Sequence, residues 1–313
     1  MKILFLDRVH PILEQRLTAN GYTCIDGTET ELSELNLQDV AGLVVRSRVN
    51  LDEKFLKNAP NLKFIARSGA GMETIDEEYC QQRNITLFNA PEGNRTAVAE
   101  HALGMILSLF NKLSNGNDEV RNGVWNREGN RGLELSGKTI GIIGFGNNGS
   151  EFAKLLSGFD CPILAYDKYK QNFGTSRIQE VDLETIFEQA DIVSFHIPQT
   201  PETLYFANTN FFQKFKNPIY LINLSRGKIV QLEDLLTAIT NGKILGACLD
   251  VLEIENKKFE QQFAEKQLPT AISELLKNDK ILFSPHVGGW TVESYFKLSD
   301  VLADKILEYS SYK

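Results

Sequence analysis

Residues 139–156 read TIGIIGFGNNGSEFAKLL, an apolar run that leads into three spaced glycines and then into a helical pattern. Gly144 permits a tight turn, and Gly146 lets the backbone approach a pyrophosphate. Gly149 removes the side chain where the helix must pack close to the strand, so that helix amides face the phosphates. The stretch predicts a β-α unit that binds a dinucleotide, with a plain strand-to-helix turn as the alternative.

The next apolar run, PILAYD, ends in Asp167. This aspartate follows the glycines at about the twenty-residue distance typical of a carboxylate that binds ribose hydroxyls. A carboxylate at this place repels the 2′-phosphate of NADP, so we expect NAD as the cofactor. Lys168 and Lys170 weaken that preference without reversing it.

Short apolar or β-branched runs alternate with helical patterns on both sides of this unit. The runs before it include KILFLD, GLVVRS and TLFNAP, and those after it include DIVSFHIP, IYLINLS and ILGACLDV. Residues 96–113 repeat apolar side chains at the helical period and are expected to connect two domains. The alternation predicts an α/β fold with parallel sheets, and a chain of 313 residues is long enough for two domains.

The composition excludes several classes of protein. A formal net charge of −8 argues against a general nucleic-acid surface, which needs clustered lysine and arginine. Cys24, Cys80, Cys161 and Cys248 lie far apart without a C-x-x-C pair, which indicates reduced, buried thiols rather than a zinc site or a disulfide framework. No signal-peptide pattern precedes the first strand, and no apolar run reaches the length of a membrane span. We expect a cytoplasmic protein that binds no nucleic acid, membrane or metal.

Several further stretches carry a family resemblance. They are VVRS, RSGAGMETID, NAPEGNRTAVAEHALGMIL, GKTIGIIGFGNNG, YDK, DIVSFHIPQTPET, INLSRGKIV, GACLDVLEIE and SPHVGG, in this order along nearly the whole chain. With them the sequence resembles the D-isomer-specific 2-hydroxyacid dehydrogenases, and within that family it is most similar to the D-3-phosphoglycerate dehydrogenases. The resemblance implies a Rossmann NAD-binding domain over residues 95–289. By the same resemblance, this domain would be inserted into a flavodoxin-like substrate-binding domain of residues 1–94 and 290–313, and the chain would form a homodimer through the NAD-binding domain.

The resemblance also implies a catalytic set of Arg226, Glu255 and His286. Reduction of a 2-keto acid needs a hydride donor, a cation on the carboxylate and carbonyl, and a proton donor. Arg226 can hold a carboxylate through two parallel hydrogen bonds, unless it is an ordinary surface arginine in a turn. By the resemblance, His286 would carry the proton, and Glu255 would stabilise its imidazolium form. Glu253 competes for that role, but the family's spacing from Asp250 selects Glu255.

The remaining site residues fall into two groups that are implied by the same resemblance. The cofactor would contact Gly144, Gly146, Asn147, Asn148, Gly149, Asp167, His196, Leu224, Asp250, Gly288 and Gly289. The substrate would contact Arg46, Ser47, Arg67, Ala70, Gly71, Asn94 and, across a dimer, Arg127. Asp250 would hold the nicotinamide carboxamide, and the arginines would bind a second anionic group on the substrate. The alternative is that Arg46 and Arg48 are solvated charges at the end of a strand.

Some positions depart from the family pattern. Asn147 and Asn148 stand where a basic residue and isoleucine are usual, and Asn256 stands where proline is usual. Trp290 replaces a small residue; it either narrows the mouth of the pocket or packs against the last helix. The stretch between Glu255 and His286 is longer than usual, and we expect a lid, an interface element or, from the spacing of its phenylalanines 259 and 263, a small helix.

The other histidines are interpreted as structural. His101 is expected to be a packed or bordering ring in the long helix, His10 lies in a strand-to-helix turn, and His196 would border the adenine.

Three functions are compatible with these observations. We expect an NAD-dependent enzyme that interconverts D-3-phosphoglycerate and 3-phosphohydroxypyruvate in serine biosynthesis. The alternatives are a reductase for glyoxylate, hydroxypyruvate or another 2-keto acid and, from another class, an NAD(H)-responsive binding protein. Because the sequence stops after its last helix, we expect no feedback by serine through a further domain.

Overall fold

The computed structural model describes residues 1–255 and 268–311 of the chain. These residues form two compact units, one of residues 1–95 and 290–311 and the other of residues 96–255 and 268–289. The expectations for Asn256, Phe259 and Phe263 fall outside the described residues.

The first unit is built on a parallel sheet. Within the described ranges this sheet has five strands in the order β2-β1-β3-β4-β5, which is the order of flavodoxin-like folds. The strands are β1 (Lys2–Phe5), β2 (Thr23–Asp26), β3 (Gly42–Val45), β4 (Phe64–Arg67) and β5 (Thr86–Asn89). The helices are α1 (Ile12–Ala19), η1 (Leu32–Glu34), α2 (Glu53–Leu56), α3 (Glu77–Gln82) and α11 (Val292–Ser311).

Successive residues of these strands enter two different cores. Ile3 and Phe5 pack with apolar residues of α1 and α11, whereas Leu4 packs with those of α2 and α3. Because neighbouring side chains of a strand point to opposite faces, helices cover both faces of the sheet. This arrangement explains why the strands are nearly continuous apolar runs.

The second unit contains a longer parallel sheet. In the part of the chain that the structure describes, its seven strands follow the order β12-β11-β10-β9-β6-β7-β8. The strands are β6 (Ile140–Ile143), β7 (Ile163–Tyr166), β8 (Ile178–Glu180), β9 (Ile192–Phe195), β10 (Ile219–Asn223), β11 (Ile244–Leu249) and β12 (Ile281–Phe283). Counted from β6, this is the doubly wound order of dinucleotide-binding domains, with the switch point between β6 and β9. The predicted fold class, α/β with two parallel sheets, is confirmed.

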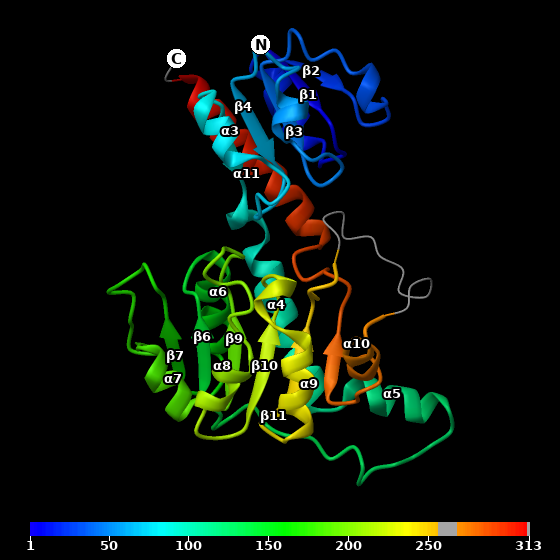
Figure 1. Cartoon of the computed structure of the whole chain (residues 1–313), viewed down its shortest axis with the longest axis vertical. Coiled ribbons are helices and arrows are strands. Elements are labelled where there is room, and N and C mark those ends of the chain that lie inside the picture. Colours follow the sequence, from blue (N-terminus) through cyan, green and yellow to red (C-terminus); the bar gives the residue numbers. More distant parts are fainter. Residues whose placement is uncertain (256–267, 312–313) are drawn as a thin grey trace. The chain divides into compact units, whose positions relative to one another are not determined.

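The second sheet is also covered on both faces. The helices are α4 (Pro91–Phe110), α5 (Leu113–Arg121), α6 (Asn147–Leu156), α7 (Leu183–Gln189), α8 (Thr209–Lys214), η2 (Gly227–Ile229), α9 (Leu232–Thr240) and α10 (Thr270–Leu275). Ile142 packs with residues of α4 and α6, and the next residue, Ile143, packs with residues of α7, α8 and α9. Figure 1 shows the strands of this sheet side by side with these helices around them.

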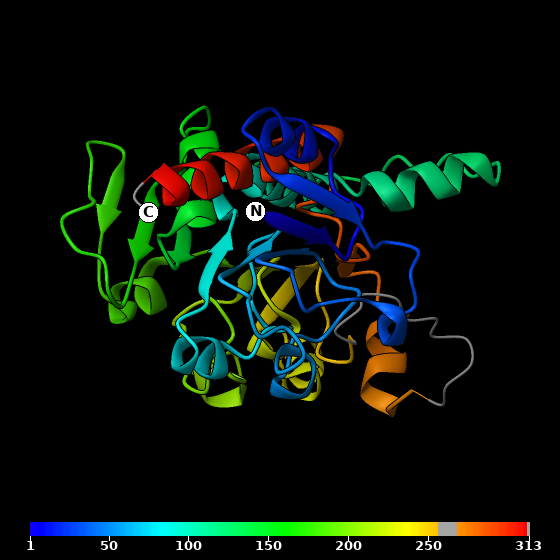
Figure 2. The ribbon, with the colours of Figure 1, turned by 90° about the horizontal axis from the view of Figure 1, so that it is seen from above.

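The start and the end of the long helix differ from the sequence expectation. The long helix begins at Pro91 rather than at residue 96, since proline is well suited to the first helical position. It stops at Phe110, and Lys112 adopts a left-handed conformation with φ of 51° before α5 begins. In both ribbon views α5 extends away from the sheet of its unit (Figures 1 and 2).

The cysteines require a partial correction. All four lie in described segments as free thiols, but Cys24 and Cys161 are half-buried, and only Cys80 and Cys248 are buried. Burial raises the pKa of the Cys80 thiol to about 11 and raises that of Cys248 further. These two thiols therefore stay protonated at neutral pH.

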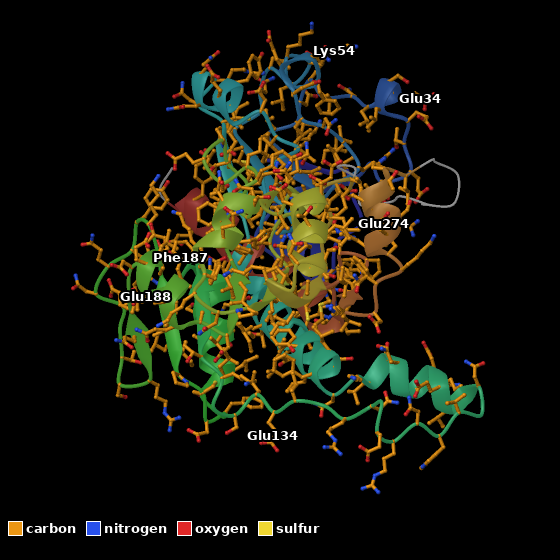
Figure 3. The ribbon with its side chains drawn as sticks, turned by 60° about the horizontal axis from the view of Figure 1, so that its bottom comes forward. Glu34, Lys54, Glu134, Phe187, Glu188 and Glu274 are labelled. Carbon is orange, nitrogen blue, oxygen red and sulfur yellow. The ribbon has the colours of Figure 1, made fainter. Side chains whose placement is uncertain are left out.

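Several charged side chains of both units are exposed. Figure 3 labels the exposed residues Glu34, Lys54, Glu134, Glu188 and Glu274, and the buried residue Phe187 of α7.

Candidate active site

The glycine-rich turn joins β6 to α6. Gly144 has a φ of +96°, and an added Cβ would lie 2.6 Å from the carbonyl oxygen of His196. At Gly149 an added Cβ would lie 2.0 Å from the carbonyl oxygen of Gly144, so the helix and the turn require both glycines. At Gly146 an added Cβ would meet no described atom within 4 Å, which leaves this backbone open to a ligand.

The N-terminus of α6 can receive an anion. The helix begins at Asn147, and no side chain of the described residues caps it, so amide groups of its first turn remain available. Oδ1 of Asn148 is buried and has no hydrogen-bond partner among the described residues. A buried oxygen without a hydrogen-bond partner is satisfied when a ligand donates a hydrogen bond to it.

Asp167 directly follows β7 and is held by backbone amides. Its Oδ2 accepts a hydrogen bond from Phe145 N at 2.7 Å, and its Oδ1 accepts from Tyr169 N and Lys170 N at 2.9 Å each. Burial raises the pKa of Asp167, but these amides and the charge of Lys170 outweigh it and leave the pKa below its ordinary value. The carboxylate is therefore ionised and fixed beside the glycine-rich turn.

These features together fit a dinucleotide. The open backbone and the uncapped helix complement phosphates, while the ionised carboxylate keeps lone pairs for ribose hydroxyls.

His196 ends β9 next to this turn. Its Nε2 lies 2.8 Å from Oγ of Ser194, and its ring packs against Phe152 with 5.4 Å between the ring centroids. Desolvation lowers the pKa of His196 to about 4, so the ring is neutral at pH 7.

Asp250 follows β11 and anchors the loop of residues 284–288. Its side chain is 2% exposed. Oδ1 accepts hydrogen bonds from Ser284 Oγ at 2.6 Å and from Val287 N at 2.9 Å, and Oδ2 accepts from Gly288 N at 2.8 Å. The carboxylate therefore fixes the loop on which His286 lies.

Two further residues line this carboxylate. Nε2 of His101 lies 2.8 Å from Ser284 Oγ and 3.7 Å from Asp250 Oδ1. An added Cβ at Gly288 would lie 3.1 Å from Cδ2 of Leu224 and 2.9 Å from Oδ2 of Asp250. Leu224 and the loop are thus in close contact, and Gly289 follows directly. Of the two alternatives for His101, a packed or a bordering ring, the second describes it, because the ring belongs to a polar network around a buried carboxylate.

His286 and Glu255 are brought together by two loops. Nδ1 of His286 lies 2.6 Å from Oε2 of Glu255, and the two side chains are 24% and 22% exposed. Oε1 of Glu255 accepts a hydrogen bond from Leu252 N. The backbone of His286 has a φ of 55° and donates its N–H to Asp250 O at 2.8 Å. Because Glu255 accepts the proton on Nδ1, Nε2 is the ring nitrogen at which the imidazole can gain or lose a proton.

Arg226 follows β10 at the start of η2. Its Nη1 donates to Ser225 O at 2.7 Å. An added Cβ at Gly227 would lie 2.0 Å from Leu252 O. Glycine after the arginine therefore lets this turn lie against the loop that carries Glu255.

Glu253 points elsewhere. Its Oε1 accepts a hydrogen bond from Leu232 N at 3.3 Å, and desolvation raises its pKa. Of the two competing glutamates, Glu255 is the one beside His286.

In the first unit, three backbone amides surround one aspartate. Oδ2 of Asp7, which follows β1, accepts from Arg46 N at 2.6 Å, Ser47 N at 3.1 Å and Arg48 N at 3.3 Å. The guanidinium of Arg46 lies over the ring of Trp290, with 3.7 Å from Cζ to the ring centroid. Sequence reasoning missed Asp7, although its place at the carboxyl end of the first strand was a usable signal.

The other predicted substrate residues differ in exposure. Arg67 is only 7% exposed, and an added Cβ at Gly69 would lie 1.9 Å from its Nη1. The carbonyl oxygen of Ala70 accepts from Asn89 Nδ2 at 2.7 Å, and Gly71 follows in the same loop. Asn94, in the first turns of α4, has a buried Oδ1 without a hydrogen-bond partner in the described ranges.

Arg127 lies in the second unit, in an exposed segment after α5.

Among the described residues no group of histidine, cysteine, aspartate and glutamate side chains could hold a metal ion. None of the described helices has the length and apolarity that crossing a membrane requires.

A family model for the NAD binding domain of the D-isomer specific 2-hydroxyacid dehydrogenases matches residues 103–288. The chain belongs to this family. The match includes the glycine-rich turn, Arg226, Glu255 and His286, and it covers most of the second unit.

Relatives match nearly the whole chain. A D-3-phosphoglycerate dehydrogenase of Archaeoglobus fulgidus is 32% identical over 311 residues, which cover 98% of this chain and 57% of that protein. The chain thus spans little more than half of that relative's length. A hydroxypyruvate reductase of Thermotoga maritima is 32% identical over 272 residues, which cover 87% of this chain and 85% of that protein.

A solved structure shows the same fold. The D-lactate dehydrogenase of Aquifex aeolicus, in complex with NAD and lactic acid, superposes with a TM-score of 0.83 at 25% identity, over 99% of this chain and 96% of that one.

Proposed function

We propose that the protein is an NAD-dependent D-2-hydroxyacid dehydrogenase whose preferred keto substrate is 3-phosphohydroxypyruvate. The pairing of Glu255 Oε2 with His286 Nδ1 at 2.6 Å is the observation that carries this proposal, because it leaves Nε2 as a positioned proton donor. Bound NADH supplies the hydride for the carbonyl carbon.

The chain's own residues supply the rest of the chemistry. His286 Nε2 gives a proton to the substrate's carbonyl oxygen in reduction and takes it back in oxidation, and Glu255 stabilises the charged ring. Arg226 holds the substrate carboxylate with two N–H groups. In the first unit, the amides of Ala70 and Gly71 offer donors to the substrate, and the buried Oδ1 of Asn94, which has no partner among the described residues, offers an acceptor to a substrate hydroxyl.

Two considerations support a substrate with a second anion. Arg46 and Arg67 follow or end neighbouring strands, β3 and β4, whose carboxyl ends meet at one edge of the first sheet. Cations clustered in a protein with net charge −8 favour a multiply charged ligand. The proposed product of reduction is D-3-phosphoglycerate, which places the oxidative direction in serine biosynthesis.

The experiment is a panel of 2-keto acids assayed with NADH at fixed pH. The proposal expects the highest kcat/KM for 3-phosphohydroxypyruvate. Preference for hydroxypyruvate or glyoxylate would favour the second candidate, a general reductase, which the Thermotoga maritima relative supports. NADH binding without turnover of any keto acid would favour an NAD(H)-responsive binding protein.

We also propose a cytoplasmic homodimer formed through the second unit. Support comes from α5 and the segment after it, where large apolar side chains are exposed: Leu113 by 59%, Val120 by 54%, Val124 by 48%, Trp125 by 83% and Leu133 by 45%. Exposed apolar surface of this extent favours a protein partner, and Arg127 in this segment would then reach the neighbouring subunit. Light scattering should give twice the mass of 35.2 kDa, and Trp125→Glu should reduce it to one chain.

A further inference from the structure

Trp290 is a large apolar side chain that is 45% exposed, so core packing does not account for it. Its ring meets that of Tyr295 on α11 edge to face, with 5.7 Å between the centroids, and Tyr295 in turn meets His10 at 5.5 Å. The indole is thus fixed against the last helix, as one of the two sequence interpretations expected. Its other contact is the stack with the Arg46 guanidinium at 3.7 Å.

Arg46 and Arg48 lie two residues apart and differ in their hydrogen bonds. Arg48 Nη1 donates to Leu6 O at 3.2 Å and Gly27 O at 2.8 Å, and its Nη2 donates to Thr30 O at 2.6 Å. Arg48 is therefore a structural residue and not a solvated charge. The guanidinium of Arg46, by contrast, makes no hydrogen bond or ion pair with the described residues.

The Arg46 cation is nevertheless partly desolvated. Burial lowers the pKa of Arg46, and the charge of Asp7 partly offsets this effect. A half-buried cation with unfilled donors is complemented by an anion. Because the indole covers one flat face of the guanidinium, an anion binds in its plane, where two N–H groups match two oxygens.

We infer that Trp290 is a positioning residue that holds the Arg46 guanidinium for the second anionic group of the substrate, a phosphate. This inference rests on the proposed function. A flexible arginine must be ordered each time it binds, whereas a stacked one is already ordered, so the tryptophan selects for the phosphorylated substrate.

The test compares kcat/KM for 3-phosphohydroxypyruvate and hydroxypyruvate, which lacks the phosphate. Trp290→Ala should lower the value for the phosphorylated substrate about tenfold, mainly through KM, and change that for hydroxypyruvate less than about twofold. Trp290→Phe keeps an aromatic face and should retain most of the parent's kcat/KM for 3-phosphohydroxypyruvate. Phe296→Ala is the matched control, because Phe296 lies on α11 beside Tyr295 and its ring meets that of His10 at 5.1 Å, not Arg46.

A double-mutant cycle separates positioning from a general change of the pocket. In the Arg46→Ala background, Trp290→Ala should have no further effect, since the group it positions is gone. Equal losses on both substrates, or losses that add in the double variant, would overturn the inference.

A second measurement does not depend on which substrate is preferred. Inorganic phosphate should inhibit hydroxypyruvate reduction competitively, and its inhibition constant should rise about tenfold in Arg46→Ala and Trp290→Ala alike. An unchanged constant in Trp290→Ala refutes the role of Trp290. The parent enzyme could prefer hydroxypyruvate while the inhibition constant of phosphate still rises in both variants. That result would refute only the proposed substrate.

Discussion

Oε2 of Glu255 lies 2.6 Å from Nδ1 of His286, and the backbone that carries the ring has a φ of 55°. A left-handed conformation costs a non-glycine residue about 1–3 kcal/mol, so its surroundings must hold it. Asp250 provides that support, since its carbonyl oxygen accepts from His286 N and its carboxylate binds the next two amides. The loop therefore favours one position of the ring, against Glu255.

The first prediction concerns Glu255→Gln. The carboxylate holds Nδ1 of His286 at 2.6 Å and fixes the ring that carries the proton, so kcat for keto-acid reduction should fall about tenfold or more. Steady-state rates at one fixed pH test this. Glu253→Gln, whose side chain accepts a hydrogen bond from Leu232 N, should leave kcat unchanged. The opposite pattern would give the role to Glu253.

The second prediction concerns His286→Asn. The variant lacks the proton donor, so kcat for reduction should fall about 10²- to 10⁴-fold. The glycine-rich turn and Asp167 lie on other segments, and the dissociation constant for NADH, measured by fluorescence, should change little. Near-full turnover would show that another group transfers the proton.

The sequence missed two strands, and each of them lies at the edge of a sheet. Thr23–Asp26 and Ile178–Glu180 were not expected, and they form β2 and β8, each at one edge of its sheet. Most of their side chains are exposed or half-buried, so they lack the apolar run that marks a central strand.

For the site, the sequence predicted the turns that local motifs encode and missed contacts between distant segments. Helical periodicity placed His101 in a helix, but its contact with Ser284 joins residues 183 positions apart. The contact of Arg46 with Trp290 likewise depends on how β3 and the start of α11 pack in the first unit. Periodicity reports only which face of an element is buried, not which distant side chain meets it.

The third prediction concerns cofactor preference. Asp167 is ionised, so the 2′-phosphate of NADPH is repelled, and kcat/KM should be higher with NADH by about tenfold or more. Asp167→Ala should bring the kcat/KM values with NADH and NADPH closer together, chiefly by lowering the KM for NADPH. Equal efficiencies with the two cofactors in the parent would contradict the assignment of this carboxylate to the ribose.

The fourth prediction concerns stability at mildly acidic pH. The pKa of His196 is about 4 in the folded chain and about 6.5 when unfolded, so the unfolded state binds more protons between these values. The free energy of unfolding should therefore fall as the pH drops through this window, with a contribution of up to about 2 kcal/mol at pH 5. Urea unfolding at pH 7.5 and pH 5 should show a smaller loss in His196→Gln. The same loss in both proteins would assign it to other groups.

The last prediction concerns Ser284, whose hydroxyl donates to the buried carboxylate of Asp250 at 2.6 Å and lies 2.8 Å from His101 Nε2. In Ser284→Ala the carboxylate keeps the amides of Val287 and Gly288 but loses its shortest donor. A hydrogen bond to a buried charge contributes about 1.5–3 kcal/mol, so the free energy of unfolding should fall by that amount. The loop that holds His286 should also loosen, and kcat should fall several-fold. Ser157→Ala, at an exposed serine whose hydroxyl donates to Lys154 O, is the control and should change stability by less than about 0.5 kcal/mol. If Ser284→Ala matches this control in both urea unfolding and kcat, the amides alone fix Asp250, and the network with His101 has no part in holding the loop.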